Sequence, residues 1–167
     1  MKLKDKILMF FACVMALLVV ALTAFSALGF RQFSIYNTER HARSVAETVK
    51  VGLTESMIHG TIDKRQQFLS RLSSVTGVKQ VRVMRGPAVV KQFGPGLASE
   101  SANNDDVKAV LASGKDVFDV VEVDGEQIFH AVIPYIANDQ GLPNCLQCHA
   151  VSSGTVLGAV SIDISLA

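Results

Sequence analysis

The sequence has few of the features that mark nucleic-acid-binding or repeat proteins. It contains no tryptophan, aromatic residues make up 7% of its 167 positions, and no stripe of basic residues is interleaved with aromatics. The formal net charge is only +1, and nothing in this pattern suggests nucleic-acid binding. Internal repeats and low-complexity tracts are also lacking, which leaves one domain of ordinary size and an N-terminal appendage.

Charged residues are absent from Ile7 to Phe30, a run of 24 residues. About 20 apolar residues in a helix cross a bilayer, so this run is long enough to span one. It is also longer than the apolar core of a cleaved signal peptide, which has about 7–15 residues, although Ala24-Phe25-Ser26 offers a small-residue cleavage site. We therefore expect residues 1–30 to form a cytoplasmic stub and a retained, single-pass transmembrane anchor.

Beyond the anchor, the segment from Arg31 to Val51 contains neither Gly nor Pro, so we expect the transmembrane helix to continue as a long extramembrane helix. This helix should run to about Ile58 and end at Gly60. Apolar residues recur at every fourth position along it and predict one inward-facing stripe: Val45, Val49, Leu53 and Met57. A second helix is expected between Thr61 and Gly77.

From Val78 onwards the apolar residues alternate with a period of two, which predicts strands. Short turns between consecutive strands, of which Asp124-Gly125 is the strongest signal, indicate an antiparallel sheet with one face buried under the two helices. A short helix, Val107 to Ala112, interrupts the strands. The fold class is therefore α+β, a PAS-type sandwich. The five expected strands run from Val78 to the Gly86-Pro87 turn, Ala88 to Phe93, Val117 to Val123, Gln127 to Ile136, and Thr155 to Leu166.

Only three cysteines are present, and two of them belong to the motif Cys145-Leu-Gln-Cys148-His149. Cys-x-x-Cys-His is the attachment motif of c-type haem. Its spacing lets two thioethers reach the two vinyl groups on one edge of the porphyrin. The next residue then projects an imidazole over the ring, so His149 is the expected proximal iron ligand. We therefore expect one covalent haem c.

Three other kinds of cysteine site fit this motif less well. A structural zinc site needs four ligands, and no second Cys or His pair follows; Cys13, inside the apolar run, is most simply a packing residue. A thioredoxin-type pair starts a helix in a βαβ unit, whereas Gly141-Leu-Pro-Asn precedes this motif and Ser152-Ser-Gly follows it. A disulfide across two residues would be strained. Because haem is attached outside the inner membrane, residues 31–167 are expected in the periplasm.

A sixth iron ligand decides whether a haem transfers electrons or binds gas. Five side chains are candidates for it: Met57, His59, His130, Met84 and His41. Met57 comes first because it continues the apolar stripe, and His59, about 200° away around the helix, comes second. His130 follows as a strand residue that is either a satisfied sheet histidine or a haem neighbour. Met84 is expected on the polar face of its strand, and His41 lies too close to the membrane.

The combination of these elements resembles the haem-containing periplasmic sensor domains of methyl-accepting chemotaxis proteins and sensor kinases in metal-reducing bacteria. The resemblance covers residues 1–167 and rests on the anchor, the helix ending in Glu55-Ser-Met57-Ile-His59-Gly60, and the Cys145-x-x-Cys148-His149 motif before the last strand. It implies a PAS-like fold, a proximal His149, a distal Met that is Met57 here, and dimerisation through the N-terminal helix. Sensors of this class continue into a second transmembrane helix and a cytoplasmic signalling module, which the 167 residues do not include.

We therefore expect a sensor that detects redox state or a small gaseous ligand through exchange of the distal haem ligand, without enzymatic activity. The alternative is a membrane-tethered monohaem cytochrome that carries electrons with permanent His/Met ligation. A peroxidase would need an acid–base group in an open distal site; His59 or His130 would be available, but nothing positions a second catalytic group. The expected partners are the bacterial inner membrane, a second copy of the chain, and a gas or redox partner.

Overall fold

The long helix expected from the sequence is present as α1 (Leu3–Ile58), in a computed structural model that describes residues 3–102, 104–140 and 144–166. It ends where predicted, because Gly60 adopts a left-handed φ of 66° that cannot continue a helix. The expected loops from Ser99 to Asp106 and from Asn138 to Ser153 extend over residues 103 and 141–143, which lie outside the described residues.

The chain divides into two units between Asn37 and Thr38, and α1 contributes to both. The N-terminal unit is the apolar part of α1, whose most apolar window has a mean hydropathy of 2.8 and is 0% buried. By length and composition this helix can cross a membrane, a test that a signal sequence near the N-terminus also passes. The predicted division after residue 30 stays a prediction.

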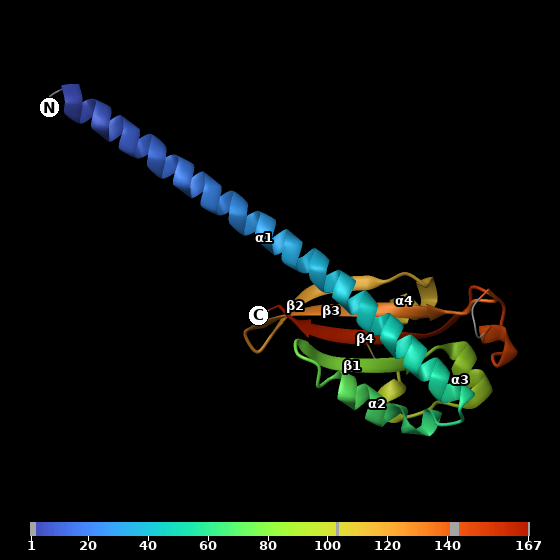
Figure 1. The fold of residues 1–167 in the computed structure, drawn as a ribbon. Helices are drawn as coiled ribbons and strands as arrows, with labels where there is room; N and C mark the ends of the chain where they lie inside the picture. Colours follow the sequence, from blue (N-terminus) through green and yellow to red (C-terminus); the bar gives the residue numbers. More distant parts are fainter. Residues whose placement is uncertain (1–2, 103, 141–143, 167) are drawn as a thin grey trace. The chain divides into compact units, whose positions relative to one another are not determined.

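The C-terminal unit contains an antiparallel sheet of four strands in the order β1-β4-β3-β2 (Figure 1). The described strands are β1 (Val78–Arg85), β2 (Val117–Val123), β3 (Glu126–Ile136) and β4 (Val156–Ser165). The predicted α+β class is confirmed, and so are four of the five predicted strands. Asp124 and Gly125 turn the chain between β2 and β3 with the positive φ values, 51° and 79°, that a type I′ hairpin turn requires.

The predicted strand from Ala88 to Phe93 is wrong, because this segment is helix α3 (Pro87–Phe93). Its first residue is a proline, at the helix position that proline prefers. The preceding Gly86 donates its N–H to the carbonyl oxygen of Leu157 in β4, at 2.8 Å. A side chain at Gly86 would come within 2.8 Å of that same oxygen, so the start of α3 is fixed by a contact with the sheet that only glycine permits.

Both faces of the sheet are covered, whereas the alternation predicted one buried face. Five consecutive residues of β4, Gly158 to Ile162, are buried, which burial on one face alone cannot produce. One face packs against the part of α1 that follows Thr38 (Figure 1). There the Tyr135 hydroxyl donates to the Ala46 carbonyl oxygen at 3.1 Å, and the Arg43 guanidinium carbon lies 4.7 Å from the ring centroid of Phe118.

The buried side of α1 contains Val49 and Leu53 of the predicted stripe but not Val45 and Met57. The buried residues of α1 are Ala42, Ala46, Val49 and Leu53. Their alternating spacing of four and three follows the 3.6 residues of a helical turn, whereas strict steps of four drift by about 40° each. Helix α2 (Arg65–Leu72), which follows the short helix η1 (Ile62–Lys64), packs beside α1. A side chain at Gly52 would lie 2.5 Å from the Phe68 ring, so the two helices meet closely there.

The opposite face of the sheet is covered by α4 (Asp105–Ser113), which confirms the predicted short helix. Two of its residues join strand residues in a buried apolar cluster: Met84, Val107, Val110, Val132 and Ala159. Val132 and Tyr135 are three positions apart on β3, so their side chains point to opposite faces. The sheet is therefore the middle layer between α1 and α4.

Candidate functional site

The Cys145-Leu-Gln-Cys148-His149 motif lies in the connection between β3 and β4. Two hydrogen bonds close this connection at its base: the Ala137 N–H donates to the Thr155 carbonyl oxygen at 2.8 Å, and the Gly154 N–H donates to the Ala137 carbonyl oxygen at 2.9 Å. The sheet thereby fixes both ends of the segment that carries the motif.

The motif itself forms one tight turn, η3 (Cys145–Gln147). The Asn144 side chain caps this turn by accepting a hydrogen bond from the backbone N–H two residues later, at 2.8 Å. The N–H groups of Cys148 and His149 both donate to the Cys145 carbonyl oxygen, at 3.3 and 3.0 Å. Cys148 directly follows this turn as its C-cap, and residues three apart in a 3₁₀ turn lie on the same side of it, so we expect the two free thiols to lie on one side.

Gln92, near the end of α3, holds the motif against the rest of the domain. Its Nε2 donates to the Cys148 carbonyl oxygen, and its Oε1 accepts from the Ala150 N–H, each at 2.9 Å. One side-chain amide thus satisfies the two backbone groups that flank His149. Gln92 was not predicted from the sequence, because it lies 56 positions before Cys148 in a segment that was expected to be a strand.

The His149 ring packs edge-on against Phe93, the last residue of α3, with ring centroids 5.4 Å apart and ring planes at 83°. Burial lowers the pKa of His149, which favours the neutral imidazole that can bind a metal. Its Nδ1 is buried without a hydrogen-bond partner in the described parts of the chain, and Nε2 is not among such buried atoms. Nε2 is the other ring nitrogen through which His149 could bind a metal.

The surroundings of the motif fit a covalently attached haem. Two free thiols on one side of a turn and an adjacent imidazole are the groups that the attachment uses, and these three side chains would hold the haem. Apolar side chains available to cover a porphyrin are exposed on the bordering elements, with Val90 and Phe93 of α3 at 38% and 53% and Ile136 of β3 at 43%. Within the described residues, no three His, Cys, Asp or Glu side chains cluster to hold a bare metal ion.

Met57 and His59 lie at the end of α1, and both side chains are exposed. Met57 is 43% exposed, so its predicted inward orientation is wrong; it falls beyond the buried stripe because of the drift described above. His59 is 69% exposed, and its Nδ1 lies 2.9 Å from the carbonyl oxygen of Glu55. Neither side chain is hydrogen-bonded to the described part of the motif. The distal role of Met57, with His59 as the alternative, stays a prediction.

The other three distal candidates occupy different environments. Met84 shares a face of β1 with Arg82, as predicted, but it is 2% exposed in the apolar cluster under α4, so this part of the face is covered and not polar. His130 does lie on a strand, and its Nδ1 is 2.5 Å from the carboxylate of Asp163 on the neighbouring β4. The hydrogen bond with Asp163 raises the pKa of His130. His41 is exposed on α1.

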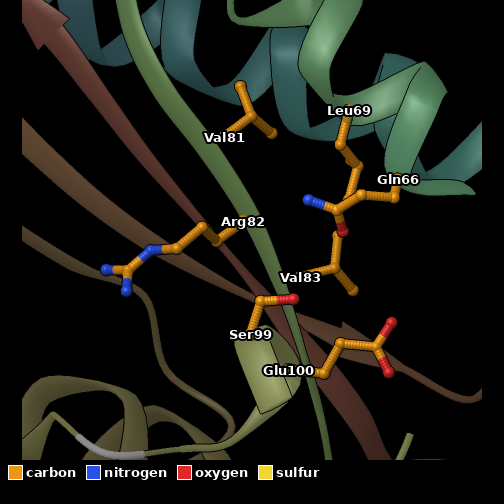
Figure 2. Close-up of a pocket in the computed structure, with 7 residues that line it drawn as sticks. All are labelled: Gln66, Leu69, Val81, Arg82, Val83, Ser99 and Glu100. Carbon is orange, nitrogen blue, oxygen red and sulfur yellow. The ribbon is translucent and has the colours of Figure 1, made fainter. Parts of the chain in front are cut away.

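A small cavity lies between α2 and the edge strand β1, and none of its lining residues belongs to the motif (Figure 2). Its volume of about 20 Å³ is enough for a water molecule and excludes an organic cofactor. Glu100, in the short helix η2 (Ala98–Glu100), borders it and forms ion pairs with Arg65 and with Arg85, the latter at 2.8 Å. The lining residues are Gln66, Leu69, Val81, Arg82, Val83, Ser99 and Glu100.

Comparison with known proteins assigns no family to the chain. No protein-family model matches the sequence, and no curated protein matches it. The resemblance to haem-containing sensor domains therefore stays a prediction that rests on the motif and on the order of the elements, and the functional assignment rests on the geometry of the site.

Proposed function

We propose that residues 31–167 form a periplasmic c-type haem sensor domain, held in a bacterial inner membrane by the N-terminal part of α1. The turn at η3 carries this proposal. There Cys145 and Cys148 carry free thiols three positions apart in one turn, and the His149 imidazole follows directly. The apolar helix α1 agrees with the proposal independently, since covalent haem attachment requires that the domain be exported.

Each residue of the site has a separate role. The thiols of Cys145 and Cys148 would hold the haem by adding across its vinyl C=C bonds, with each S–H hydrogen ending on carbon, so no oxidant would be needed. His149, with Phe93 packed against its ring, would bind the iron through Nε2. Gln92 holds the backbone on either side of His149. When bound, the haem supplies an iron whose oxidation state and sixth ligand can change.

Met57 connects the site to the anchor because both belong to α1. A thioether is a soft, neutral ligand that binds ferric iron weakly, so a change of oxidation state or an incoming gas molecule would release it. Met57 is exposed and lies one residue before the end of the helix. A bond from Met57 to the iron would therefore restrain the last turn of α1, and loss of that bond would remove the restraint. A change of ligand at the iron would thereby act directly on the helix that includes the membrane anchor.

An exposed apolar strip on α1 supports dimerisation through this helix. Val51 and Ile58 are 60% and 55% exposed and lie seven positions apart, which places them on the same side of the helix two turns apart. A second copy of the chain would bury this strip by packing its own α1 against it. The proposed assembly is therefore a homodimer.

The alternative function is electron transfer by a membrane-tethered cytochrome. The exposure of Cys148 favours it, because a thioether at the surface places one edge of the porphyrin near solvent and within reach of a redox partner. The two functions differ in the sixth ligand, which a carrier keeps and a sensor exchanges.

Haem attachment is tested by replacing both motif cysteines in the full chain, co-expressed with a cytochrome c maturation system. The wild-type protein should retain haem after extraction with acidified acetone, and Cys145→Ala/Cys148→Ala should release or lose it. Cys13→Ala is the matched control, because Cys13 is the third free cysteine and lies in the apolar part of α1. Covalent haem in the double variant, or none in the wild type, would overturn the proposal.

Sensing is tested on the haem-loaded chain by optical spectra of both oxidation states, with and without carbon monoxide. A sensor should exchange its distal ligand and show the carbon monoxide adduct of ferrous haem at equilibrium. A spectrum that stays six-coordinate and indifferent to carbon monoxide would instead establish the electron carrier.

A further inference from the structure

Four polar side chains lie next to one another on the sheet face that α4 covers. In the register of the sheet, Arg82 of β1 is paired with Ser161 of β4, and His130 of β3 is paired with Asp163 of β4. Ser161 and Asp163 are two positions apart, so they point to the same face. This is the face of the buried Met84, which lies two positions from Arg82 and packs under α4.

Two hydrogen-bond donors of this group are buried without a partner. Arg82 Nε and Ser161 Oγ make no hydrogen bond to any described residue, and Ser161 is only 1% exposed. An unsatisfied buried donor costs about 1–3 kcal/mol, and a charged one costs more. Two such donors on directly paired residues indicate that something outside the chain satisfies them.

Arg82 also has no ion-pair partner among the described residues, although it neighbours the ion pairs of Glu100. Figure 2 shows its guanidinium directed away from Glu100 and Gln66, toward the other side of β1. The carboxylate of Glu100 is instead bound by Arg65 and Arg85. The positive charge of Arg82 is therefore available to a ligand on the α4 side of the sheet.

His130 and Asp163 lie next to Arg82 and Ser161 and are more exposed to solvent than Ser161 is. Their side chains are 12% and 22% exposed, so solvent reaches the group from their side. The hydrogen bond with Asp163 raises the pKa of His130, against burial and the charge of Arg82, and the charge of Asp106 on α4 raises it further. Asp163 is thus hydrogen-bonded to His130, whereas Arg82 has no ion-pair partner among the described residues.

We propose that Arg82 and Ser161 bind the carboxylate of a small organic acid on this face. The planar fork of a guanidinium matches a carboxylate with two parallel hydrogen bonds, and the Ser161 hydroxyl donates a third. A single carboxylate would pair with the positive charge of Arg82. A dianion such as phosphate would meet the carboxylate of Asp163. The site uses none of the haem-motif residues, so it does not depend on haem attachment.

Binding is tested with propionate, by titration calorimetry and by thermal unfolding of the full chain in detergent micelles. Propionamide is the matched probe, since it has the same shape without the charge. Propionate should bind saturably and raise the unfolding temperature, whereas propionamide and inorganic phosphate should do neither. Equal effects of propionate and propionamide, stronger binding of phosphate, or no carboxylate binding across acetate, propionate and succinate would each overturn the proposal.

Two variants test the assigned residues. Arg82→Gln should weaken propionate binding by at least about tenfold, since hydrogen bonds to charged groups contribute about 1.5–3 kcal/mol. Arg71→Gln, at an exposed arginine of α2, is the matched control and should bind as the wild type does. Ser161→Ala removes a hydroxyl that is unpaired in the ligand-free protein, so it should fold normally and still weaken binding by several-fold. Unchanged affinity in Ser161→Ala and Arg82→Gln would remove these residues from the site.

Discussion

Gln92 donates a hydrogen bond from its Nε2 to the carbonyl oxygen of Cys148, at 2.9 Å, and so joins the end of α3 to the Cys145-x-x-Cys148-His149 motif. The same side chain accepts from the Ala150 N–H. Gln92 thereby positions the backbone on both sides of His149 without being one of the proposed haem ligands. A fixed backbone at this point positions the His149 ring against Phe93.

Replacing Gln92 with alanine should loosen the motif without unfolding the domain. Two hydrogen bonds at about 0.5–1.5 kcal/mol each give a loss of about 1–2 kcal/mol in the free energy of unfolding, measured by urea denaturation. Hydrogen exchange at the Ala150 N–H should become faster. Lys91→Ala, at the exposed neighbouring position, should change neither quantity. Unaltered exchange at Ala150 in Gln92→Ala would show that the hydrogen bond does not restrain the motif.

The parts of the fold that local chemistry dictates could be predicted from the sequence. Asp124-Gly125 predicted a hairpin because few other residue pairs adopt two consecutive positive φ values, and the structure has them. The three motif residues were expected together because they are neighbours in the chain. The segment from Ala88 to Phe93 was misassigned because its valines favour a strand, while the Gly86–Leu157 hydrogen bond and the proline at the first helical position favour α3.

Features that depend on distant contacts could not be predicted. Gln92 had no signal in the sequence, since its role exists only because α3 lies beside the β3–β4 connection. Met84 was expected on a polar face because Arg82 precedes it by two positions. In the structure Arg82 and Met84 point to the same face of the sheet, and α4 covers this face at the Met84 end of β1. A period of two identifies which residues share a face, but not which helix covers it.

The buried carboxylate of Glu100 should be the most costly single polar group to neutralise in the domain. It is 4% exposed and pairs with both Arg65 and Arg85. Glu100→Gln leaves two arginines without their partner, which should lower the free energy of unfolding by about 3–5 kcal/mol at pH 7. Glu122→Gln, at an exposed position of β2, should change it by less than about 0.5 kcal/mol. Equal losses in the two variants would show that the ion pairs of Glu100 with Arg65 and Arg85 do not stabilise the domain.

The stability difference between the wild type and Glu100→Gln should also depend on pH. Burial raises the pKa of Glu100, but the hydrogen bonds from Arg65 and the Leu97 N–H, together with the two arginine charges, outweigh burial and lower it. A lowered pKa in the folded state means that the stabilisation is complete above the unfolded-state pKa of about 4.3 and is lost as the pH falls through the folded-state pKa. The stability difference between wild type and Glu100→Gln should therefore shrink below about pH 4.

The anchor is predicted to be retained in the mature protein. The full chain should sediment with membranes, resist extraction with alkaline carbonate, and keep its N-terminal residues by intact mass. Leu18→Arg places a charge in the middle of the apolar run, at a cost of about 2.5–3.5 kcal/mol for insertion, and should shift protein to the soluble fraction. Leu3→Arg, at the end of the helix, should not. A soluble periplasmic protein that begins at Ala27 would show instead that the segment is a cleaved signal.

Met57 is predicted to be the distal haem ligand. It is the exposed thioether in the last turn of α1, and a haem covering that position would bury it. Met57→Ala should abolish the near-infrared sulfur-to-iron charge-transfer band of the ferric protein and open the iron to carbon monoxide. It should also lower the reduction potential if a histidine or water takes its place, because a soft, neutral ligand favours ferrous iron.

His59→Ala is the decisive comparison because His59 lies two residues from Met57 on the same chain segment and is more exposed. Two positions in a helix are about 200° apart, so both side chains cannot face one iron while the helix persists. If Met57 is the ligand, His59→Ala leaves the charge-transfer band and the potential unchanged. A high-spin iron in His59→Ala with an unaltered spectrum in Met57→Ala would make the haem bis-histidine. The tighter, permanent ligation of two imidazoles would then favour electron transfer over sensing.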